Sequence, residues 1–214
     1  EKHLRKNSSV AVGWGTTIRS IPSYIHHMDT MGLVFLPIIG GHGQSELNMH
    51  ATTIASNFAK KSGGRSISLI APALVKSGEE KRILIQDEQI KNVIDQTANA
   101  QFAIFSLGNP LVPGSSISKS GYISENDLEQ LAEEKAICDV VSTVFLDRES
   151  RECCRNITDR CIGITGSQLK KIPCKICAAE SKEKQESVKA ALEGGYIDVL
   201  IIDQVIAEYL ISEK

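Results

Sequence analysis

The stretch that decides the fold is "SSVAVGWGTTIRSIPSYI", residues 8–25. It begins as a short apolar run, which is typical of a strand covered on both faces. The run ends at Gly13 and Gly15, on either side of a tryptophan that looks exposed, and the two glycines permit a tight turn close to a ligand. Thr16 and Thr17 then offer hydroxyls and amides at a helix start, an arrangement that favours an anion such as a phosphate.

The spacing of this loop leaves two interpretations open. It contains neither G-K-[ST] nor G-x-G-x-x-G, because Arg19 and Ser20 follow the threonines. An anion-binding loop and an ordinary glycine turn with a threonine cap therefore fit equally well. Pro22 lies close behind and predicts that the helix here is short, kinked or started late.

Beyond this stretch, short apolar runs alternate with amphipathic helical stretches. This order predicts βαβ crossovers and an α/β fold: a mostly parallel, Rossmann-like sheet with helices on both faces. The predicted strands are "SSVAVGW" (8–14), "GLVFLPII" (32–39), "SISLIAP" (66–72), "AQFAIFSLG" (100–108), "CDVVSTVFLD" (138–147), "RCIGIT" (160–165), "KICAA" (175–179) and "IDVLIID" (197–203). The predicted helices lie within residues 45–64, 87–100, 124–136, 181–195 and 203–214.

Local signals support the helix ends. Ser45 and Ser124 precede their helical stretches and are expected as N-caps. The glycine pairs at 63–64 and 194–195 follow two helical stretches and are expected to stop them.

Two segments interrupt the alternation of strands and helices. Residues 108–124, "GNPLVPGSSISKSGYIS", are rich in Gly, Pro and Ser and follow a strand end, which predicts a functional loop or lid. Residues 142–154, "STVFLDRESRECC", follow the order strand, polar turn, strand, which predicts a small antiparallel excursion from the main sheet.

Composition limits the classes of partner. The 214 residues include 24 Lys+Arg and 26 Asp+Glu, for a net charge of −2, without the basic block that marks a nucleic-acid surface. The longest apolar runs are too short to cross a bilayer, so no membrane partner is expected. The chain does not begin with Met, and residues 1–214 are interpreted as one domain of a longer protein.

The cysteines raise the question of a metal or redox site. Cys153 and Cys154 are vicinal, and Cys174 and Cys177 form a lone C-x-x-C. Cys174 follows Pro173 at the start of an apolar run in which Cys177 is expected to belong to the core. Buried or strand-paired thiols are therefore favoured over a metal or redox site. We expect no metal, no cofactor and, by default, a reduced, cytoplasmic setting.

Ligands of an open α/β sheet bind where the carboxyl ends of strands meet helix starts. The second strand ends in a pliable loop with Gly40 and Gly41, where His42 and Gln44 are possible hydrogen-bond donors. An ordinary loop histidine is favoured over a catalytic one at position 42.

Three later strand ends also carry polar groups. Gly108 and Asn109 open the long loop. Lys184 follows a strand on the next helical stretch, where its ammonium either reaches a phosphate or belongs to a solvated first turn. Asp203 either caps the last helix or binds a hydroxyl, and capping alone is favoured.

Taken in order, these motifs resemble the effector-binding domain of the SorC family of bacterial transcription regulators. The resemblance covers nearly the whole chain. It rests on "GWGTT", "PIIGG", Asn48 followed by "IASNFA", "SLG", "GYIS", "KAICDV", "VFLD", "IGI…LKKIP" and "KAALEGGYIDVLIID" in family order.

The resemblance implies a fold like that of ribose-5-phosphate isomerase and glucosamine-6-phosphate deaminase. It also implies a sugar phosphate or related carbohydrate effector and no catalysis. Operator DNA would be bound by an N-terminal helix-turn-helix domain upstream of this segment, and a homodimer or homotetramer is expected.

The resemblance also assigns positions in the site. The residues that match its phosphate loop, second-strand glycines, sugar-hydroxyl acid and phosphate lysine are Gly13, Gly15, Thr16, Thr17, Gly40, Gly41, Asp139 and Lys184. Gln44 and Gly108 complete the predicted ligand-binding set. Three positions depart from the family: Ile39 replaces a basic residue, Ser181 a glycine, and Ile202 a threonine.

The sequence leaves two alternatives to this function. An isomerase or deaminase of the same fold would need a general base, for which Asp139 and Asp203 are candidates. A scaffold domain with a decayed pocket is suggested by the three departures from the family pattern.

Overall fold

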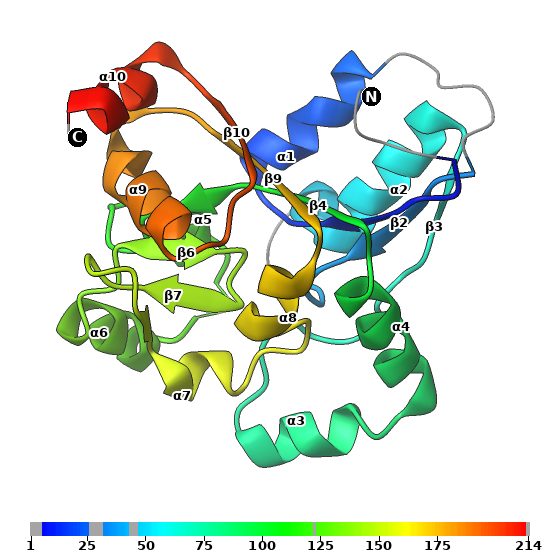
Figure 1. Ribbon diagram of the computed structural model, residues 1–214. Helices are drawn as coiled ribbons and strands as arrows, with labels where there is room; N and C mark the ends of the chain where they lie inside the picture. Colours follow the sequence, from blue (N-terminus) through cyan, green and yellow to red (C-terminus); the bar gives the residue numbers. More distant parts are fainter. Residues whose placement is uncertain (1–5, 26–31, 43–46, 122, 213–214) are drawn as a thin grey trace.

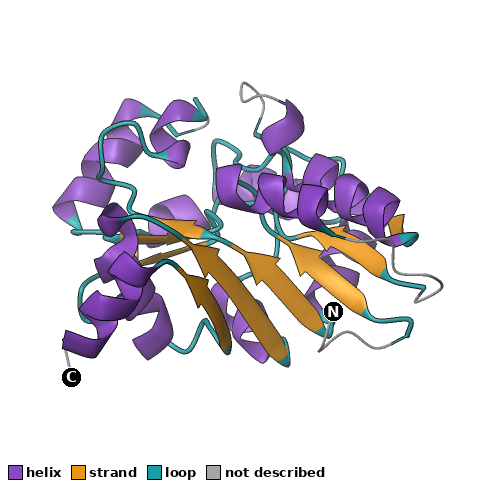
Figure 2. Ribbon diagram, turned by 90° about the horizontal axis from the view of Figure 1, so that it is seen from above, coloured by secondary structure: helices purple, strands orange, loops and turns teal. Residues whose placement is uncertain are grey.

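The core of the protein is a parallel β-sheet with helices on both of its faces (Figure 2). The structure is a computed structural model that describes residues 6–25, 32–42, 47–121 and 123–212. Within these residues six strands, all parallel to their neighbours, follow the order β10-β9-β4-β1-β2-β3. Their bounds are β1 Ser9–Val12, β2 Val34–Pro37, β3 Arg65–Ser66, β4 Phe102–Phe105, β9 Cys174–Ala179 and β10 Val199–Ile202.

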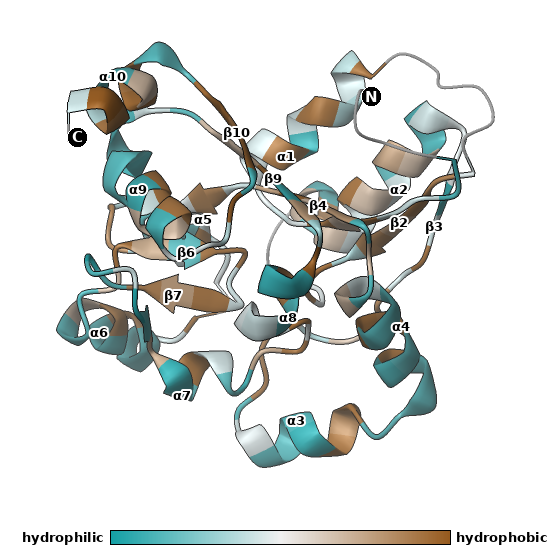
Figure 3. Cartoon of the chain, in the orientation of Figure 1, coloured by the Kyte–Doolittle hydropathy of each residue, from teal (hydrophilic) through white to brown (hydrophobic). Residues whose placement is uncertain are grey.

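The first apolar run is buried on both faces, as its sequence predicts. In β1, Val10 and Val12 pack with Ile18 and the helix residues around Phe58 on one face. Ala11 belongs to the larger core cluster on the other face. The core clusters on both faces of β1 confirm the prediction of a sheet covered on both faces. Figure 3 shows the apolar colours on strands such as β2 and β7.

A second, antiparallel sheet carries the predicted excursion. Its described strands, in the order β5-β6-β7-β8, are Leu107–Gly108, Cys138–Val140, Val144–Leu146 and Glu152–Cys153. The predicted single strand 138–147 is wrong in one respect, because it folds into the β6–β7 hairpin. Ser106 separates β4 from β5, so the chain passes there from the parallel sheet to the antiparallel one (Figure 1).

The helices cover these two sheets. Their bounds are α1 Thr16–Ser20, α2 Ala51–Ser62, α3 Gly78–Leu84, α4 Glu88–Ala98, α5 Ser116–Lys119, α6 Glu125–Glu133, α7 Arg155–Thr158, α8 Gly166–Lys171, α9 Gln185–Glu193 and α10 Gln204–Ser212. Short 3-10 turns lie at η1 Ile21–Tyr24, η2 Leu47–Met49 and η3 Lys182–Lys184. Among the described residues, no helix is long and apolar enough to cross a membrane.

Most of the predicted helix ends are confirmed. Ser124 caps α6 by accepting from the Asp127 amide, and the Asp127 carboxylate accepts in return. Gly63 ends α2 with a left-handed φ of 71°, and Gly195 has a φ of 76° after α9. Ser45 lies outside the described residues, and α2 begins later than predicted, at Ala51.

The first helix is short, as Pro22 predicts. The α-helical part, α1, covers five residues and passes directly into η1, in which Pro22 lies at an N-terminal position. Proline has no amide hydrogen to donate in a continuing α-helix, so the change of helix type occurs where the ring enters the chain.

Two predicted strands are wrong. Residues 66–72 contribute only the end of β3, and residues 160–165 form isolated bridges such as Ile39–Gly163 instead of a strand. A Cβ on Gly163 would lie 2.4 Å from the Ile38 carbonyl oxygen, so this segment crosses closely over the end of β2. The segment is held by backbone hydrogen bonds on both sides, from the Ile164 amide to the Ile38 carbonyl and from the Ile162 amide to the Ala73 carbonyl, and its apolar residues are buried there.

Candidate ligand-binding cavity

A cavity of about 400 Å³ opens at the carboxyl ends of β1, β4 and β9. The loop after β1 and the turn after β9 form two of its walls, and residues 106–117 form much of the rest. This is the edge where open parallel sheets bind their ligands. The predicted site residues that line it are Gly15, Thr16, Thr17, Gly108, Asp139 and Lys184.

Three other predicted residues lie outside this lining. A Cβ on Gly13 would lie 2.6 Å from Val141 Cγ1, and one on Gly40 would lie 2.5 Å from the Ala71 carbonyl oxygen. Gly41 follows Gly40 and donates its amide to the same oxygen, at 2.9 Å. These positions bring chain segments close together, a packing role that a glycine can also have. Gln44 lies outside the described residues.

The loop after β1 presents its backbone to the cavity. Gly15 has φ 114° and ψ 169°, a conformation that is essentially restricted to glycine, and a Cβ there would meet nothing within 4 Å. Thr16 and Thr17 follow as the first residues of α1, and no side chain caps that helix. The glycine therefore leaves open space beside two hydroxyl-bearing residues.

Asp139 is the buried acid of the cavity. It lies in β6 and is 7% exposed, and its Oδ1 accepts a 2.5 Å hydrogen bond from the Ser142 amide. Burial raises the pKa of this carboxyl from 3.8 to about 7, and the hydrogen bonds from Ser142 offset only part of that rise. The Asp139 carboxyl therefore changes its charge near neutral pH.

The turn that holds Asp139 is strained. Val141 and Ser142 both have positive φ, 49° and 60°, and the Thr143 amide donates to the Val140 carbonyl across the turn. Positive φ is rare for a β-branched residue, and such residues are concentrated at functional sites. Val141 itself lines the cavity, so the strained turn forms part of its wall.

Substitution of Asp139 by asparagine tests this carboxyl directly. Between pH 4 and 7 the folded state keeps a proton that the unfolded state has lost, so the stability of the native protein falls as pH rises through this window. Asp139→Asn removes that loss, which is on the order of 2–4 kcal/mol. The free energy of unfolding in urea, measured for the variant and the parent at pH 4 and pH 8, should favour the variant more at pH 8 than at pH 4. An equal difference at both pH values would contradict the assignment.

Lys184 supplies the positive charge of the cavity. It is the last residue of η3, half-buried, and within the described part of the chain it forms no ion pair. Burial lowers its pKa, while the Glu180 carboxylate favours the charged form. An ammonium placed in this way is available to an anion that enters the cavity.

Asp203 connects the turn after β9 to the last helix. One carboxylate oxygen accepts from the Ile206 amide at 3.0 Å, which confirms the predicted cap of α10. The other accepts from the Ser181 amide at 2.8 Å. These two hydrogen bonds lower the pKa of Asp203, and they keep it in a structural role outside the lining of the cavity.

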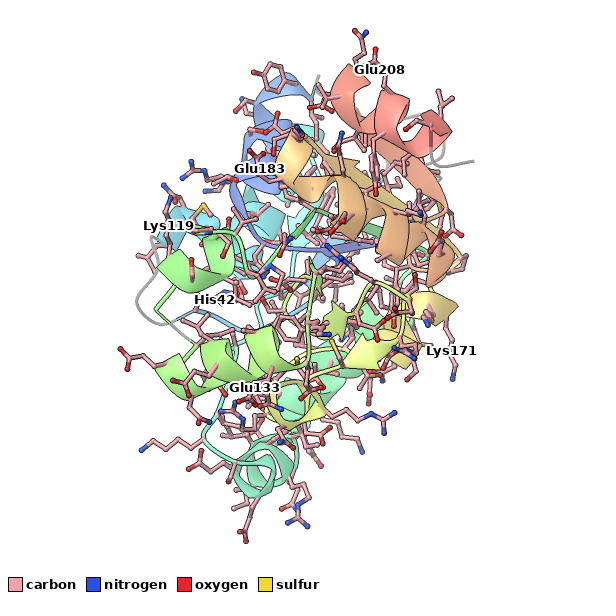
Figure 4. The ribbon with its side chains drawn as sticks, turned by 90° about the vertical axis from the view of Figure 1, so that its left-hand side faces the viewer. His42, Lys119, Glu133, Lys171, Glu183 and Glu208 are labelled. Atoms are coloured by element: carbon pink, nitrogen blue, oxygen red, sulfur yellow. The ribbon has the colours of Figure 1, made fainter. Side chains whose placement is uncertain are left out.

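Trp14 lines the cavity and packs against the buried His42. Trp14, which looks exposed in the sequence, is only 5% exposed, and its ring lies 4.0 Å from that of His42, centroid to centroid. Figure 4 shows His42 inside the molecule. Burial, and secondly His50, lower the pKa of His42 to about 3, so its imidazole is neutral at physiological pH. His42, predicted as an ordinary loop histidine and not a catalytic one, is thus buried in the core.

Several lining residues were not in the predicted site. Ser106 lies within a predicted strand, Ser115 and Ser116 lie in the long loop, and Ser181 and Glu183 lie in the turn before α9. The Gly/Pro/Ser-rich composition of the long loop could have identified its serines as site residues. Ser181 could have been identified more directly, because it replaces a glycine of the family pattern.

A parallel sheet with a polar cavity at its carboxyl edge, beside a small antiparallel sheet, defines a Rossmann-like ligand-binding domain. The family model described as "Putative sugar-binding domain" matches residues 1–212. The chain belongs to this family, the sugar-binding domain of SorC-type transcription regulators.

Individual relatives agree with this membership. A "Deoxyribonucleoside regulator" of Bacillus subtilis (strain 168) is 28% identical over 98% of this chain and 66% of its own length. A DeoR family transcriptional regulator from Listeria monocytogenes is 31% identical with a TM-score of 0.86, over 98% of this chain and 81% of that one. The full-length sorbitol operon regulator SorC from Klebsiella pneumoniae shares the fold, at 22% identity and a TM-score of 0.89. The match covers 98% of this chain and 67% of that one. The chain spans about two thirds of the length of the curated relatives it matches.

Proposed function

We propose that this domain senses a carbohydrate effector, a sugar or a sugar phosphate, for a bacterial transcription regulator. The observation that carries the proposal is the cavity at the carboxyl edge of the sheet, which combines Thr16 and Thr17 with Asp139 and Lys184. Family membership supports the sugar class, and the printed names of the relatives support the regulatory role.

The chemistry of the lining suggests how such a ligand lies. A phosphate is expected on the hydroxyls of Thr16 and Thr17 and on the ammonium of Lys184, because these groups donate hydrogen bonds to anions. Sugar hydroxyls are expected to lie at Asp139 and to donate hydrogen bonds to its carboxylate. Gly15 and Gly108 leave room at the wall, since a Cβ at either position would meet nothing within 4 Å.

The ligand would act by preferring one arrangement of the regulator, and no bond would be made or broken. It can shift that balance only by its different affinity for the two arrangements. The loop 108–124 is the proposed moving part: residues 108–110 and 112–117 line the cavity, and Ile117 is buried in the core beside the antiparallel sheet. The operator DNA would be bound by a separate N-terminal domain, and the regulator would be a homodimer or homotetramer.

A thermal-shift screen with matched phosphorylated and unphosphorylated sugars tests this proposal. A sugar that binds only the folded state raises the unfolding temperature in proportion to its occupancy. We expect at least one member of the panel to stabilise the domain at millimolar concentration. If no member did, the result would favour a scaffold whose pocket has lost its ligand.

A sugar-phosphate isomerase or deaminase is the second candidate. The feature that favours it is Asp139, whose pKa of about 7 suits a general base. Incubation of the protein with phosphorylated aldoses and ketoses distinguishes the two functions. Saturable binding without interconversion supports the sensor, whereas turnover above background would replace it by the enzyme.

A further inference from the structure

Ser181 has a backbone conformation that serine rarely adopts. Its φ is 86° and its ψ is 149°, in a region that is essentially restricted to glycine. A residue with a side chain is strained there, and such strain persists only where the surrounding structure imposes it. The outlier therefore requires an explanation in terms of what the backbone and the side chain each do.

Hydrogen bonds on both sides of Ser181 impose the backbone conformation. The Ser181 amide donates to Asp203 Oδ2 at 2.8 Å, and the Ser181 carbonyl accepts from the Lys184 amide at 3.2 Å. A glycine would make both of these backbone hydrogen bonds without the strain. The backbone therefore accounts for the conformation but not for the serine side chain.

Ser181 belongs to the wall of the candidate site. Ser181 lines the cavity together with Lys184 and Glu183, and its side chain interacts with the Glu183 carboxylate and lowers the pKa of that group. Glu183 is exposed in η3, just before α9 (Figure 4), so water can replace this interaction at little cost. The Ser181 hydroxyl can then turn from Glu183 towards a ligand.

The cavity is short of positive charge for a phosphate. Among the described residues that line it, Lys184 is the single cation, whereas Asp139 and Glu183 are acids. A neutral hydroxyl beside the ammonium adds a donor without adding charge. Position 39, where the resemblance places a basic residue, is an isoleucine in this chain.

We propose that Ser181 is a specificity-determining residue of the site, and that its hydroxyl donates to the anionic group held by Lys184. The proposal rests on the proposed function, which it deepens by assigning a phosphate-contacting side chain that the family pattern lacks. Ser181 would favour phosphorylated over unphosphorylated forms of the same sugar.

Two substitutions separate the side chain from the strain. Ser181→Ala keeps the strained backbone and removes the hydroxyl, whereas Ser181→Gly removes both. Ser150→Ala is the matched control, because Ser150 also has a positive φ, 61°, but does not line the cavity. The probes are inorganic phosphate against chloride at equal ionic strength, and ribose 5-phosphate against ribose.

Thermal shift and calorimetry give the readouts. We expect both Ser181 variants to bind inorganic phosphate about tenfold more weakly than the parent. Ser181→Gly should also raise the unfolding temperature without phosphate by about 2–4 °C, since it relieves the strain. Ser150→Ala should bind phosphate as the parent does.

The outcomes that overturn this inference differ from those that overturn the proposed function. Equal phosphate affinity of Ser181→Ala and the parent, or no phosphate response of the parent, would overturn the role of Ser181. A phosphate response that weakens in both variants while no sugar of the screen binds would support Ser181 and overturn the sugar effector.

Discussion

Substitution of Lys184 by alanine should weaken the binding of a phosphorylated sugar by about 1–3 kcal/mol, or roughly 5- to 150-fold. The ammonium forms no ion pair within the described residues and lies in the wall of the cavity, so its removal deletes a charge-assisted contact to the ligand and little else. The unphosphorylated form of the same sugar should lose much less affinity. Calorimetric titration of the two forms measures the difference.

Lys182→Ala is the control for this prediction. Lys182 belongs to the same 3-10 turn but is exposed and does not line the cavity, so its removal changes net charge by the same amount. Thr17→Ala should also weaken binding of the phosphorylated sugar, since Thr17 lines the same cavity. Equal losses in Lys182→Ala and Lys184→Ala would show that general charge, and not a placed ammonium, attracts the ligand.

Gly40→Ala should destabilise the domain by about 3 kcal/mol. A Cβ at position 40 would lie 2.5 Å from the carbonyl oxygens of both Ala71 and Pro72, and backbone atoms cannot yield as a side chain can. Gly41→Ala is the matched substitution next to it. Its Cβ would lie 3.3 Å from His50 Nδ1, in a side chain, so a cost below about 1 kcal/mol is expected.

Urea unfolding of these two variants decides what the second loop does. A large loss of stability in Gly40→Ala alone assigns Gly40 to packing between the end of β2 and residues 71–72. Equal, small losses of stability in both variants, together with weaker sugar binding, would instead show that the glycine pair belongs to the ligand site, as the resemblance implies.

Periodicity and local signals predicted most of the parallel sheet and its major helices. Strands β1, β2, β4, β9 and β10 form in the predicted runs, because each is a continuous apolar segment bounded by turn residues. The apolar pattern does not predict the hairpin within residues 138–147. Its turn contains Val141 and Ser142 at positive φ, and neither residue type signals such a turn.

Short helices and crossing segments limited the remaining predictions. Helix α8 begins with a capping box at Thr165 and Gln168, a signal present in the sequence but obscured by the predicted strand 160–165. Ile162 and Ile164 of that segment are buried, but only isolated bridges such as Ile39–Gly163 join it to its neighbours. Periodicity alone does not distinguish a buried segment held by isolated bridges from a strand within a sheet.

The site was predicted in outline, since strand ends identify the edge at which ligands bind. Six predicted residues line the cavity, but their contacts with a ligand remain predictions. The sequence does not distinguish Gly13 and Gly40 from Gly15, because a glycine required for close packing and one required for a positive φ are the same residue type. Only the fold separates the two roles.

The central claim is that a carbohydrate effector binds in the cavity at the carboxyl edge of the parallel sheet. The most direct measurement is a crystal structure of the domain with the sugar that stabilises it most in the thermal-shift screen. We predict electron density between Thr17 and Lys184, with sugar hydroxyls near Asp139. Density for that sugar elsewhere on the protein, with this cavity closed by its own side chains, would contradict the claim.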